Sequence, residues 1–303
     1  MKKIVELAPA KLNLYLKVLR KRTDGYHDIE TLFERIDIFD KIIVSSTKDG
    51  INIKCDSPSV PTGKGSLCYR AAELMKEKFS AKSGSAFGGK ATSGVAIKIE
   101  KHIPVAAGLG GGSSDAASIL KALNNLWSLK LKREELMEMA GFLGADVSFF
   151  LADSSFAIGT GRGDYIKPIN YAKSFWHAII SPNITLLSGE IYKLYSEVHH
   201  LTLTITGSID KILSPTLNIS NISRLKALLH NDLESIVLSR EPLIKAIKNT
   251  LGAGDNGNSL VSGSGPSVFC LYETRKEALR AKENCLRHFP DSKGWRAYIA
   301  KTY

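Results

Sequence analysis

The stretch "IPVAAGLGGGSSDAA", residues Ile103 to Ala117, has four glycines in five positions directly before a run with helical spacing. Glycine lets backbone amides turn toward a ligand with no Cβ in the way. The first turn of a helix adds N–H groups that have no partner within the helix, together with the positive end of its dipole. The stretch therefore predicts a loop that holds phosphate groups.

The helix after this loop is predicted to begin near Ser114. Its apolar face is marked by Ala116, Leu120, Leu123 and Trp127. Ser113 and Ser114 can cap that helix, and their hydroxyls could instead reach a phosphate oxygen or a magnesium ion. The alternative is a flexible surface loop that only joins a strand to a helix.

Two common phosphate loops do not fit this stretch. A P-loop needs Gly-Lys-Ser or Gly-Lys-Thr, and the chain contains neither sequence. A dinucleotide-binding fingerprint needs a third glycine where Ser113 stands, and its helix should lead into a strand, whereas a second helix is predicted here. A third way of holding a nucleotide triphosphate remains.

The composition predicts a two-domain intracellular protein that binds an anion. A chain of 303 residues that is 44% hydrophobic can bury two modest cores, and we expect domains at 1–166 and 167–303. The net charge of 41 − 30 = +11 favours a phosphorylated metabolite, a nucleic acid or a membrane surface as partner. The four scattered cysteines indicate neither a zinc site nor disulfides, and no leader or membrane-spanning run is evident, so we expect a cytoplasmic protein.

Strands and helices are mixed without regular alternation, which predicts the α+β class. Lys11 to Val18 alternates as a half-buried strand, with Lys11 and Asn13 on one face, and Asp24-Gly25 predicts a turn. A helix is expected from Arg133 to Leu143, closed by Gly144 as a left-handed cap. A Gly/Ser/Lys-rich loop is expected from Ser80 to Gly94. The second half predicts helices at 189–198, 223–230, 241–250 and 276–289.

"PVAAGLGGGSSDAA" resembles the phosphate loop of the GHMP kinases, and "SGSGPSVFCL" resembles their C-terminal glycine motif. "APAKLNLYLKV", "DGYHDIETLF", "LGADVSFFL" and "LHNDLE" resemble the branch that acts on a cytidine-diphosphate-linked methylerythritol. The resemblance implies an N-terminal domain like the second domain of ribosomal protein S5 and a ferredoxin-like C-terminal domain. It also implies ATP-dependent phosphorylation of the 2-hydroxyl of that alcohol, in the non-mevalonate route to isoprenoids.

The resemblance implies ATP and Mg²⁺ as cosubstrates and leaves the metal ligands and the oligomeric state, monomer or homodimer, open. It assigns the catalytic roles to Lys11 and Asp146. It assigns substrate contacts to Asn13, Tyr26, His27, Asp146, Ser188 and Tyr192, with Tyr26 and Tyr192 on the two faces of the cytosine ring. It assigns the ATP phosphates to Pro104, Val105, Ala106, Ala107, Gly108, Leu109, Gly110, Gly111, Gly112, Ser113 and Ser114.

The chemistry of a hydroxyl attacking a γ-phosphoryl group fits a lysine and an aspartate. The attack needs a placed proton acceptor, and the transferring group needs positive charge. Taken alone, Lys11 is as easily a solvated strand lysine, and Asp146 as easily caps a short helix. The surrounding motifs favour the catalytic reading, and Asp115 and Asp164 are the alternative bases.

The chain departs from the usual pattern of this branch at four positions: Ser66 replaces an Asn near the adenine, Ser148 a Pro, Asp164 a Glu and Ser188 a Thr. A GHMP kinase for homoserine or a mevalonate derivative is the rival enzyme, and it would have no use for two tyrosines around a pyrimidine. An RNA-binding protein with an S5-like domain is the rival outside enzymology. The basic residues form no stripe interleaved with aromatics, which argues against nucleic acid as the partner.

Overall fold

The computed structural model describes residues 2–79, 94–170, 173–199, 222–253 and 258–303. The chain divides into two compact units that interleave along the sequence. Unit 1 comprises residues 1–10, 38–105 and 110–153, and unit 2 comprises 11–37, 106–109 and 154–303. The domain boundary at residue 166 stays a prediction. The expected loop at 80–94 lies, up to residue 93, outside the described residues.

Two long strands, β1 (Lys3–Lys21) and β2 (His27–Thr47), contribute to both units. Every residue of β1 from Ala8 to Leu16 is buried, on both faces of the strand. The prediction of a half-buried strand was therefore wrong, because polar residues at alternate positions do not require that face to meet water. Lys11 is only 4% exposed and Asn13 only 2%.

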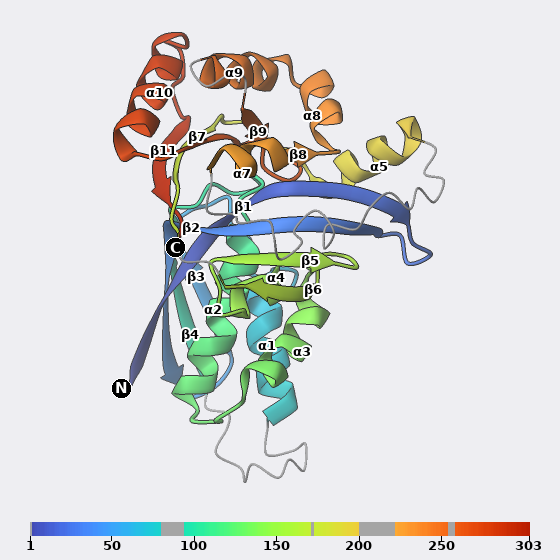
Figure 1. Cartoon of the computed structure of the whole chain (residues 1–303). Coiled ribbons are helices and arrows are strands. Elements are labelled where there is room, and N and C mark those ends of the chain that lie inside the picture. Colours follow the sequence, from blue (N-terminus) through green and yellow to red (C-terminus); the bar gives the residue numbers. More distant parts are fainter. Residues whose placement is uncertain (1, 80–93, 171–172, 200–221, 254–257) are drawn as a thin grey trace. The chain divides into compact units, whose positions relative to one another are not determined.

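Unit 1 combines the first part of β1, the second half of β2 and two further strands with a group of helices. Strand β4 (Gly94–Glu100) pairs antiparallel with the second half of β2 and parallel with β3 (Ile51–Cys55). The helices pack on one another (Figure 1), and they are α1 (Leu67–Phe79), α2 (Gly111–Leu126), α3 (Arg133–Leu143) and α4 (Val147–Leu151). All five residues of α4 are buried, which places it inside the unit.

Two details of these helices correct the sequence predictions. Helix α2 begins at Gly111 rather than near Ser114, and its N-cap is Gly110 in a left-handed conformation with φ 71°. No side chain caps this helix, so the predicted serine cap was wrong. Gly144 ends α3 in extended backbone with φ 175°, so the predicted left-handed cap was wrong as well.

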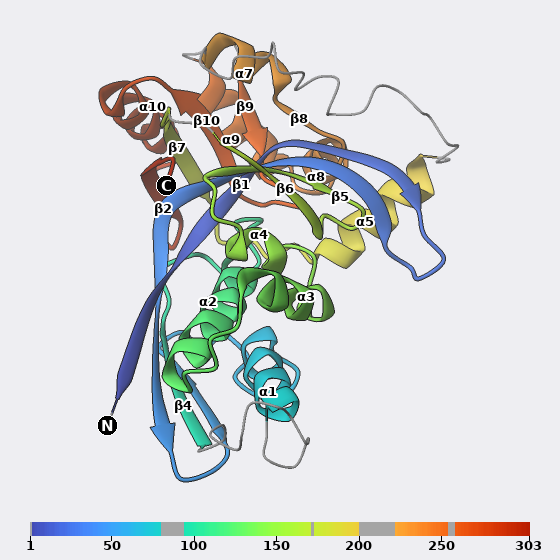
Figure 2. The ribbon, with the colours of Figure 1, turned by 60° about the horizontal axis from the view of Figure 1, so that its bottom comes forward.

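Unit 2 contains a four-stranded antiparallel sheet of order β11-β7-β10-β9. Its strands are β7 (Trp176–Ser181), β9 (Ser259–Val261), β10 (Val268–Tyr272) and β11 (Arg296–Lys301). Helices α9 (Pro242–Gly252) and α10 (Arg275–Arg287) pack on this sheet (Figure 2). Apolar side chains such as Ile180, Ile247 and Val268 fill the core between them.

The remaining strands of unit 2 extend the sheet formed by the second half of β1 and the first half of β2. Strand β8 (His230–Asn231) pairs parallel with β1 at Tyr15, and β5 (Phe156–Thr160) pairs antiparallel with both β2 and β6 (Tyr165–Ile169). The other helices are α5 (Ser188–Val198), α7 (Ile222–Leu228) and α8 (Glu234–Arg240). Helices and strands mix without regular alternation, which confirms the α+β class.

Candidate active site

The glycine loop before α2 alternates in backbone conformation. Ala106, Gly108 and Gly110, every second residue, have φ of 52°, 75° and 71°. Residues that alternate around positive φ turn successive N–H groups toward the same side and form a concave site for an anion. The loop therefore has the backbone geometry expected of a phosphate-binding segment.

The start of α2 adds donors to this loop. The first bond within the helix runs from the N–H of Ser114 to the carbonyl of Gly110, at 2.9 Å. The N–H groups of Gly111, Gly112 and Ser113 precede that bond and have no acceptor within the helix. The Oγ atom of Ser114 is buried and has no hydrogen-bond partner among the residues that the structure describes. These groups can bind oxyanions, and Ser114 keeps an unused oxygen in the first turn.

In unit 2, the loop segment 106–109 is fastened by the C-terminal glycine motif, residues 262–267. The Oγ of Ser262 donates to the carbonyl of Gly108 at 2.9 Å, and the N–H of Ser267 donates to the carbonyl of Ala107 at 3.3 Å. The backbones approach so closely that a Cβ on Gly108 would lie 2.1 Å from the Ser262 carbonyl oxygen. Only glycine fits at position 108.

The side chain of Lys11 lies in this same part of unit 2, with Asn13 beside it. Its Nζ donates to Oδ1 of Asn13, and its backbone N–H donates to the carbonyl of Leu109 at 3.0 Å. The Asn13 amide donates in turn to Thr31 Oγ1 at 2.8 Å, which donates to the Tyr15 carbonyl at 2.7 Å. This chain of donors holds the Asn13 oxygen toward the Lys11 ammonium.

The C-terminal glycine motif also approaches this pair. A Cβ on Gly263 would lie 3.0 Å from Oδ1 of Asn13 and 3.5 Å from Nζ of Lys11. Asn231 holds the motif in place, because its Nδ2 donates to the carbonyls of Val261 at 2.8 Å and Gly263 at 2.7 Å. Glycine at position 263 therefore leaves open the space beside Asn13 and Lys11 that a side chain would enter.

Asp146 belongs to unit 1, where it occupies the N-cap position of α4. It is partly buried, and its side chain makes no capping hydrogen bond to the helix. The capping alternative therefore does not account for its carboxylate. Its pairing with Lys11 remains a proposal.

Of the two tyrosines predicted to flank cytosine, Tyr192 stacks on His27. Their ring centroids are 5.2 Å apart at an interplanar angle of 25°. The Oγ of Ser196 donates to the Tyr192 carbonyl at 3.1 Å, so Nε2 of His27, 2.6 Å from the same Oγ, donates to it. Burial, aided by Lys21, lowers the pKa of His27, which keeps the imidazole neutral near pH 7.

Tyr26 lies at the turn between β1 and β2 and is 57% exposed. Its ring is covered on one side by the Arg162 guanidinium, 5.2 Å from the ring centroid. Asp164 holds that guanidinium at 2.7 Å, so the carboxylate considered as an alternative base is already ion-paired. The turn thus places an arginine against one face of the Tyr26 ring.

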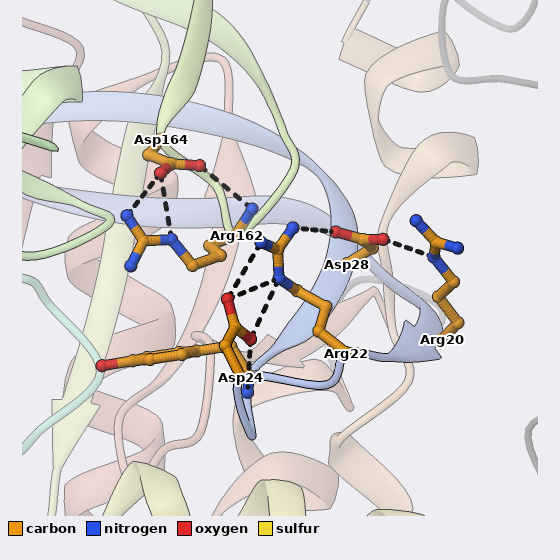
Figure 3. A network of polar contacts seen from close by, with 7 residues as sticks. Arg20, Arg22, Asp24, Asp28, Arg162 and Asp164 are labelled. Carbon is orange, nitrogen blue, oxygen red and sulfur yellow. Dashed lines mark hydrogen bonds and ion pairs between the residues drawn. The ribbon is translucent and has the colours of Figure 1, made fainter.

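A chain of ion pairs fixes this turn (Figure 3). Asp24 accepts two hydrogen bonds from Nε of Arg22 and one from the N–H of Tyr26, and Asp28 accepts from both Arg22 and Arg20. The contact with Arg22 lowers the pKa of Asp24. Because exposed pairs contribute little to stability individually, we regard their main effect here as holding the turn in one shape.

Ser188, the first residue of α5, reaches the C-terminal glycine motif. Its Oγ lies 2.7 Å from the Oγ of Ser264. Sequence reasoning missed Ser262, Asn231 and Ser196 as supports of the site. The motif around Ser262 was visible as a glycine cluster, whereas nothing local to Asn231 or Ser196 indicates what each contacts.

Two kinds of feature are absent from the residues that the structure describes. Within these residues no cluster of three or more His, Cys, Asp or Glu side chains is placed to bind a metal ion. None of the helices described is long and apolar enough to cross a membrane. All four cysteines are free thiols.

Comparison with known proteins agrees with this geometry. The family model "GHMP kinases N terminal domain" matches residues 66–154, and "GHMP kinases C terminal" matches 213–291. A curated relative from Geobacter sulfurreducens, a 4-diphosphocytidyl-2-C-methyl-D-erythritol kinase, is 38% identical over 93% of this chain and 95% of its own.

Solved structures give the same result. A crystal structure of 4-(cytidine 5'-diphospho)-2C-methyl-D-erythritol kinase is 31% identical, with a TM-score of 0.72 over 99% of this chain and all of its own. A homoserine kinase from Cytophaga hutchinsonii is 16% identical and has a TM-score of 0.71 over all of this chain and 95% of its own, a likeness of fold alone.

The loop, the C-terminal glycine motif and these matches define a kinase of the GHMP fold, and the chain belongs to the GHMP kinases. The curated relative and the crystal structure of the same kinase each cover more than nine-tenths of this chain, and this identifies the branch of the family. Within that family, the chain belongs to the 4-diphosphocytidyl-2-C-methyl-D-erythritol kinases.

Proposed function

We propose that this protein transfers the γ-phosphoryl group of ATP to the 2-hydroxyl of 4-diphosphocytidyl-2-C-methyl-D-erythritol, in the non-mevalonate route to isoprenoid precursors. The observation that carries the proposal is the buried Lys11 ammonium, held beside Asn13 and against the glycine motif. A buried ammonium in this position is suited to stabilise the negative charge that develops on a transferring phosphoryl group.

In this proposal the phosphate loop, 104–114, binds the ATP phosphates through its backbone amides. Lys11 stabilises charge that develops on the transferring phosphoryl group, and Asp146 accepts the proton of the attacking hydroxyl. Because the transition state is loose, correct placement of the hydroxyl matters more than a strongly basic carboxylate. Asn13 orients the lysine and contacts the substrate.

We expect Mg²⁺ to bind together with ATP, and the described residues offer an oxygen ligand for it. Magnesium prefers oxygen ligands and is commonly held by substrate phosphates, waters and one or two protein oxygens. The unpartnered Oγ of Ser114 is such an oxygen, in the first turn of α2. Bound there with ATP, the metal would neutralise charge on the phosphates.

The substrate's nucleotide is assigned to His27, Tyr192, Tyr26 and Ser188. The aromatic side chains offer ring faces for cytosine, and a base stacked on an aromatic side chain gains about 1–3 kcal/mol. A homoserine or mevalonate kinase would not need these rings.

We place the protein in the cytoplasm, where its four free thiols would stay reduced.

Steady-state ATP consumption by the purified protein tests the proposal. We expect turnover with the cytidine-diphosphate alcohol and none with free methylerythritol, homoserine or mevalonate. Turnover with homoserine or mevalonate would favour the rival kinases. Tight retention of bulk RNA on a filter at physiological salt, without kinase activity, would favour the RNA-binding alternative.

A further inference from the structure

A buried cluster of three charged side chains lies in unit 1, next to the phosphate loop. Nζ of Lys101 contacts Oδ2 of Asp40 and lies 2.6 Å from Oδ2 of Asp115. The side chains of Lys101, Asp40 and Asp115 are 5%, 0% and 1% exposed. Asp40 is on β2, Lys101 follows β4, and Asp115 is in the first turns of α2. The ammonium therefore links three elements.

Carboxylates also fix the backbone that leads into the loop. Asp40 Oδ1 accepts hydrogen bonds from the N–H groups of His102 at 2.6 Å and Ile103 at 2.8 Å. Asp56 Oδ1 accepts one from the N–H of Lys101 at 2.9 Å. Three consecutive N–H groups directly before Pro104 are thus held by carboxylates, which sets the direction in which the loop departs.

Burying these three charged groups costs free energy, and this cost is hard to explain if the cluster only holds the structure together. The cluster buries two carboxylates against one ammonium, and within the described part of the chain Oδ1 of Asp115 has no hydrogen-bond partner. Burial, reinforced by Asp40 and opposed by Lys101, raises the pKa of Asp115 to about 7. Apolar residues of similar shape are often as stabilising as a buried ion pair. Stability alone does not explain why these charges are present.

The Lys101 ammonium lies close to the backbone of Gly111, in the space that a side chain at position 111 would enter. A Cβ on Gly111 would lie 3.0 Å from Nζ of Lys101 and 3.0 Å from Cγ2 of Ile103. Asp115 is four residues after Gly111, about one helical turn further along. The Lys101–Asp115 contact thus restrains rotation of α2 about its axis, and that rotation would swing the N–H groups of Gly111, Gly112 and Ser113.

We propose that Lys101, Asp40 and Asp115 form a clamp that aims the first turn of α2 at the ATP phosphates, with Lys101 and Asp115 as positioning residues. The proposal rests on the function proposed above. It predicts a loss of affinity confined to the β- and γ-phosphates, because the clamp orients their donors and touches no other part of the nucleotide.

Calorimetric titration with ATP and with AMP tests the clamp on the full-length protein. Asp115→Ala should raise the Kd for ATP about tenfold, a loss of about 1.4 kcal/mol, and leave the Kd for AMP within about twofold. Asp115→Asn keeps an oxygen for Lys101 and should restore most of the ATP affinity. Glu138→Ala, at an exposed position of α3, changes the net charge equally and should match the wild type.

The outcomes are distinguishable. ATP affinity unchanged in folded Asp115→Ala, with only the melting temperature lowered, would overturn the clamp and leave the kinase assignment intact. Equal loss of ATP and AMP binding would also overturn it. A wild-type protein that binds no ATP would overturn both proposals. If Asp115→Ala does not fold, Asp115→Leu removes the oxygens but fills the volume of the side chain, and wild-type ATP affinity in that variant would refute the clamp.

Discussion

The imidazole of His27 stacks on the phenol of Tyr192, with ring centroids 5.2 Å apart, and donates through Nε2 to Ser196 one turn further along α5. The two rings come from β2 and α5. They form one aromatic surface, since the two rings stack on each other and Ser196 holds the imidazole. A base that stacks on this surface meets a platform whose side chains are already ordered.

Tyr192→Ala removes half of this platform. We expect the KM for the cytidine-diphosphate alcohol to rise about tenfold or more, with the KM for ATP nearly unchanged, because stacking acts in the ground state and the transition state alike. Tyr192→Phe keeps the stacked ring and is the matched control. Equal increases in both KM values would contradict the platform.

The lowered pKa of His27 links the platform to pH. The unfolded histidine takes up a proton near its ordinary pKa of about 6.5, whereas the folded one does so only at lower pH. His27 therefore contributes stability that is present above about pH 6.5 and is lost as the pH falls through its folded pKa. The free energy of unfolding, measured at pH 7.5 and 5.5, should show a smaller gap between wild type and His27→Gln at pH 5.5. If the difference in unfolding free energy between the two proteins does not change with pH, the pKa of His27 does not link folding to pH.

Asp146→Asn keeps the shape of the side chain and removes both the charge and the proton acceptor. We expect kcat to fall by ~10²–10⁴ with little change in substrate affinity. Folded Asp146→Asn enzyme with near wild-type turnover would refute the role of Asp146. Asp115 and Asp164 would not be simple replacements, since Lys101 and Arg162 already hold them.

Lys11→Met removes the buried cation beside Asn13 and should also lower kcat, because developing phosphoryl charge loses its partner. If Lys11 and Asp146 act on the same reacting atoms, the double variant should be far less impaired than the product of the two single effects. Rates of all three variants and the wild type, at saturating ATP and substrate, measure this. Independent, multiplicative losses would mean that the residues do not act as a unit.

The close approach at Gly108 has a matched control in the same chain. Gly108 and Gly50 have φ of 75° and 76°, but a Cβ on Gly50 would meet nothing within 4 Å. Each substitution by alanine pays about 1–2 kcal/mol for the left-handed conformation. Gly108→Ala should cost at least ~1–3 kcal/mol more, because its Cβ overlaps the Ser262 carbonyl. If urea unfolding shows equal losses of stability for the two variants, the backbone at Ser262 moves away from the new Cβ at no cost.

Helices whose apolar residues recur at a regular spacing could be predicted from the sequence. Helix α3 has the bounds that the pattern of apolar residues predicted, Arg133–Leu143. The start of α2 was misplaced because serines are common caps, whereas here a left-handed glycine begins the helix. The two-sided burial of β1 was missed because alternation of polar and apolar residues reports side-chain type and not what covers the polar face.

The site was predictable in its residue types and only partly in its contacts. The glycine loop, Lys11 and Asn13 could be named from local sequence and resemblance. The stacking of Tyr192 on His27 could not, because α5 is more than 150 residues from His27 and only packing brings the two rings together. For the same reason, the contact of Arg162 with Tyr26 has no local signal.

By itself, the sequence predicted that the backbone at 108–112 binds an anion, since four glycines before a helix leave the backbone amides accessible. It also determined the kinase family, through motifs spread in order along the chain. Only the tertiary structure decided that Lys11 is buried on Asn13 and that Lys101 joins Asp40 to Asp115. Such contacts join residues far apart in the chain, and desolvation and pairing of a charge exist only after those segments have packed together.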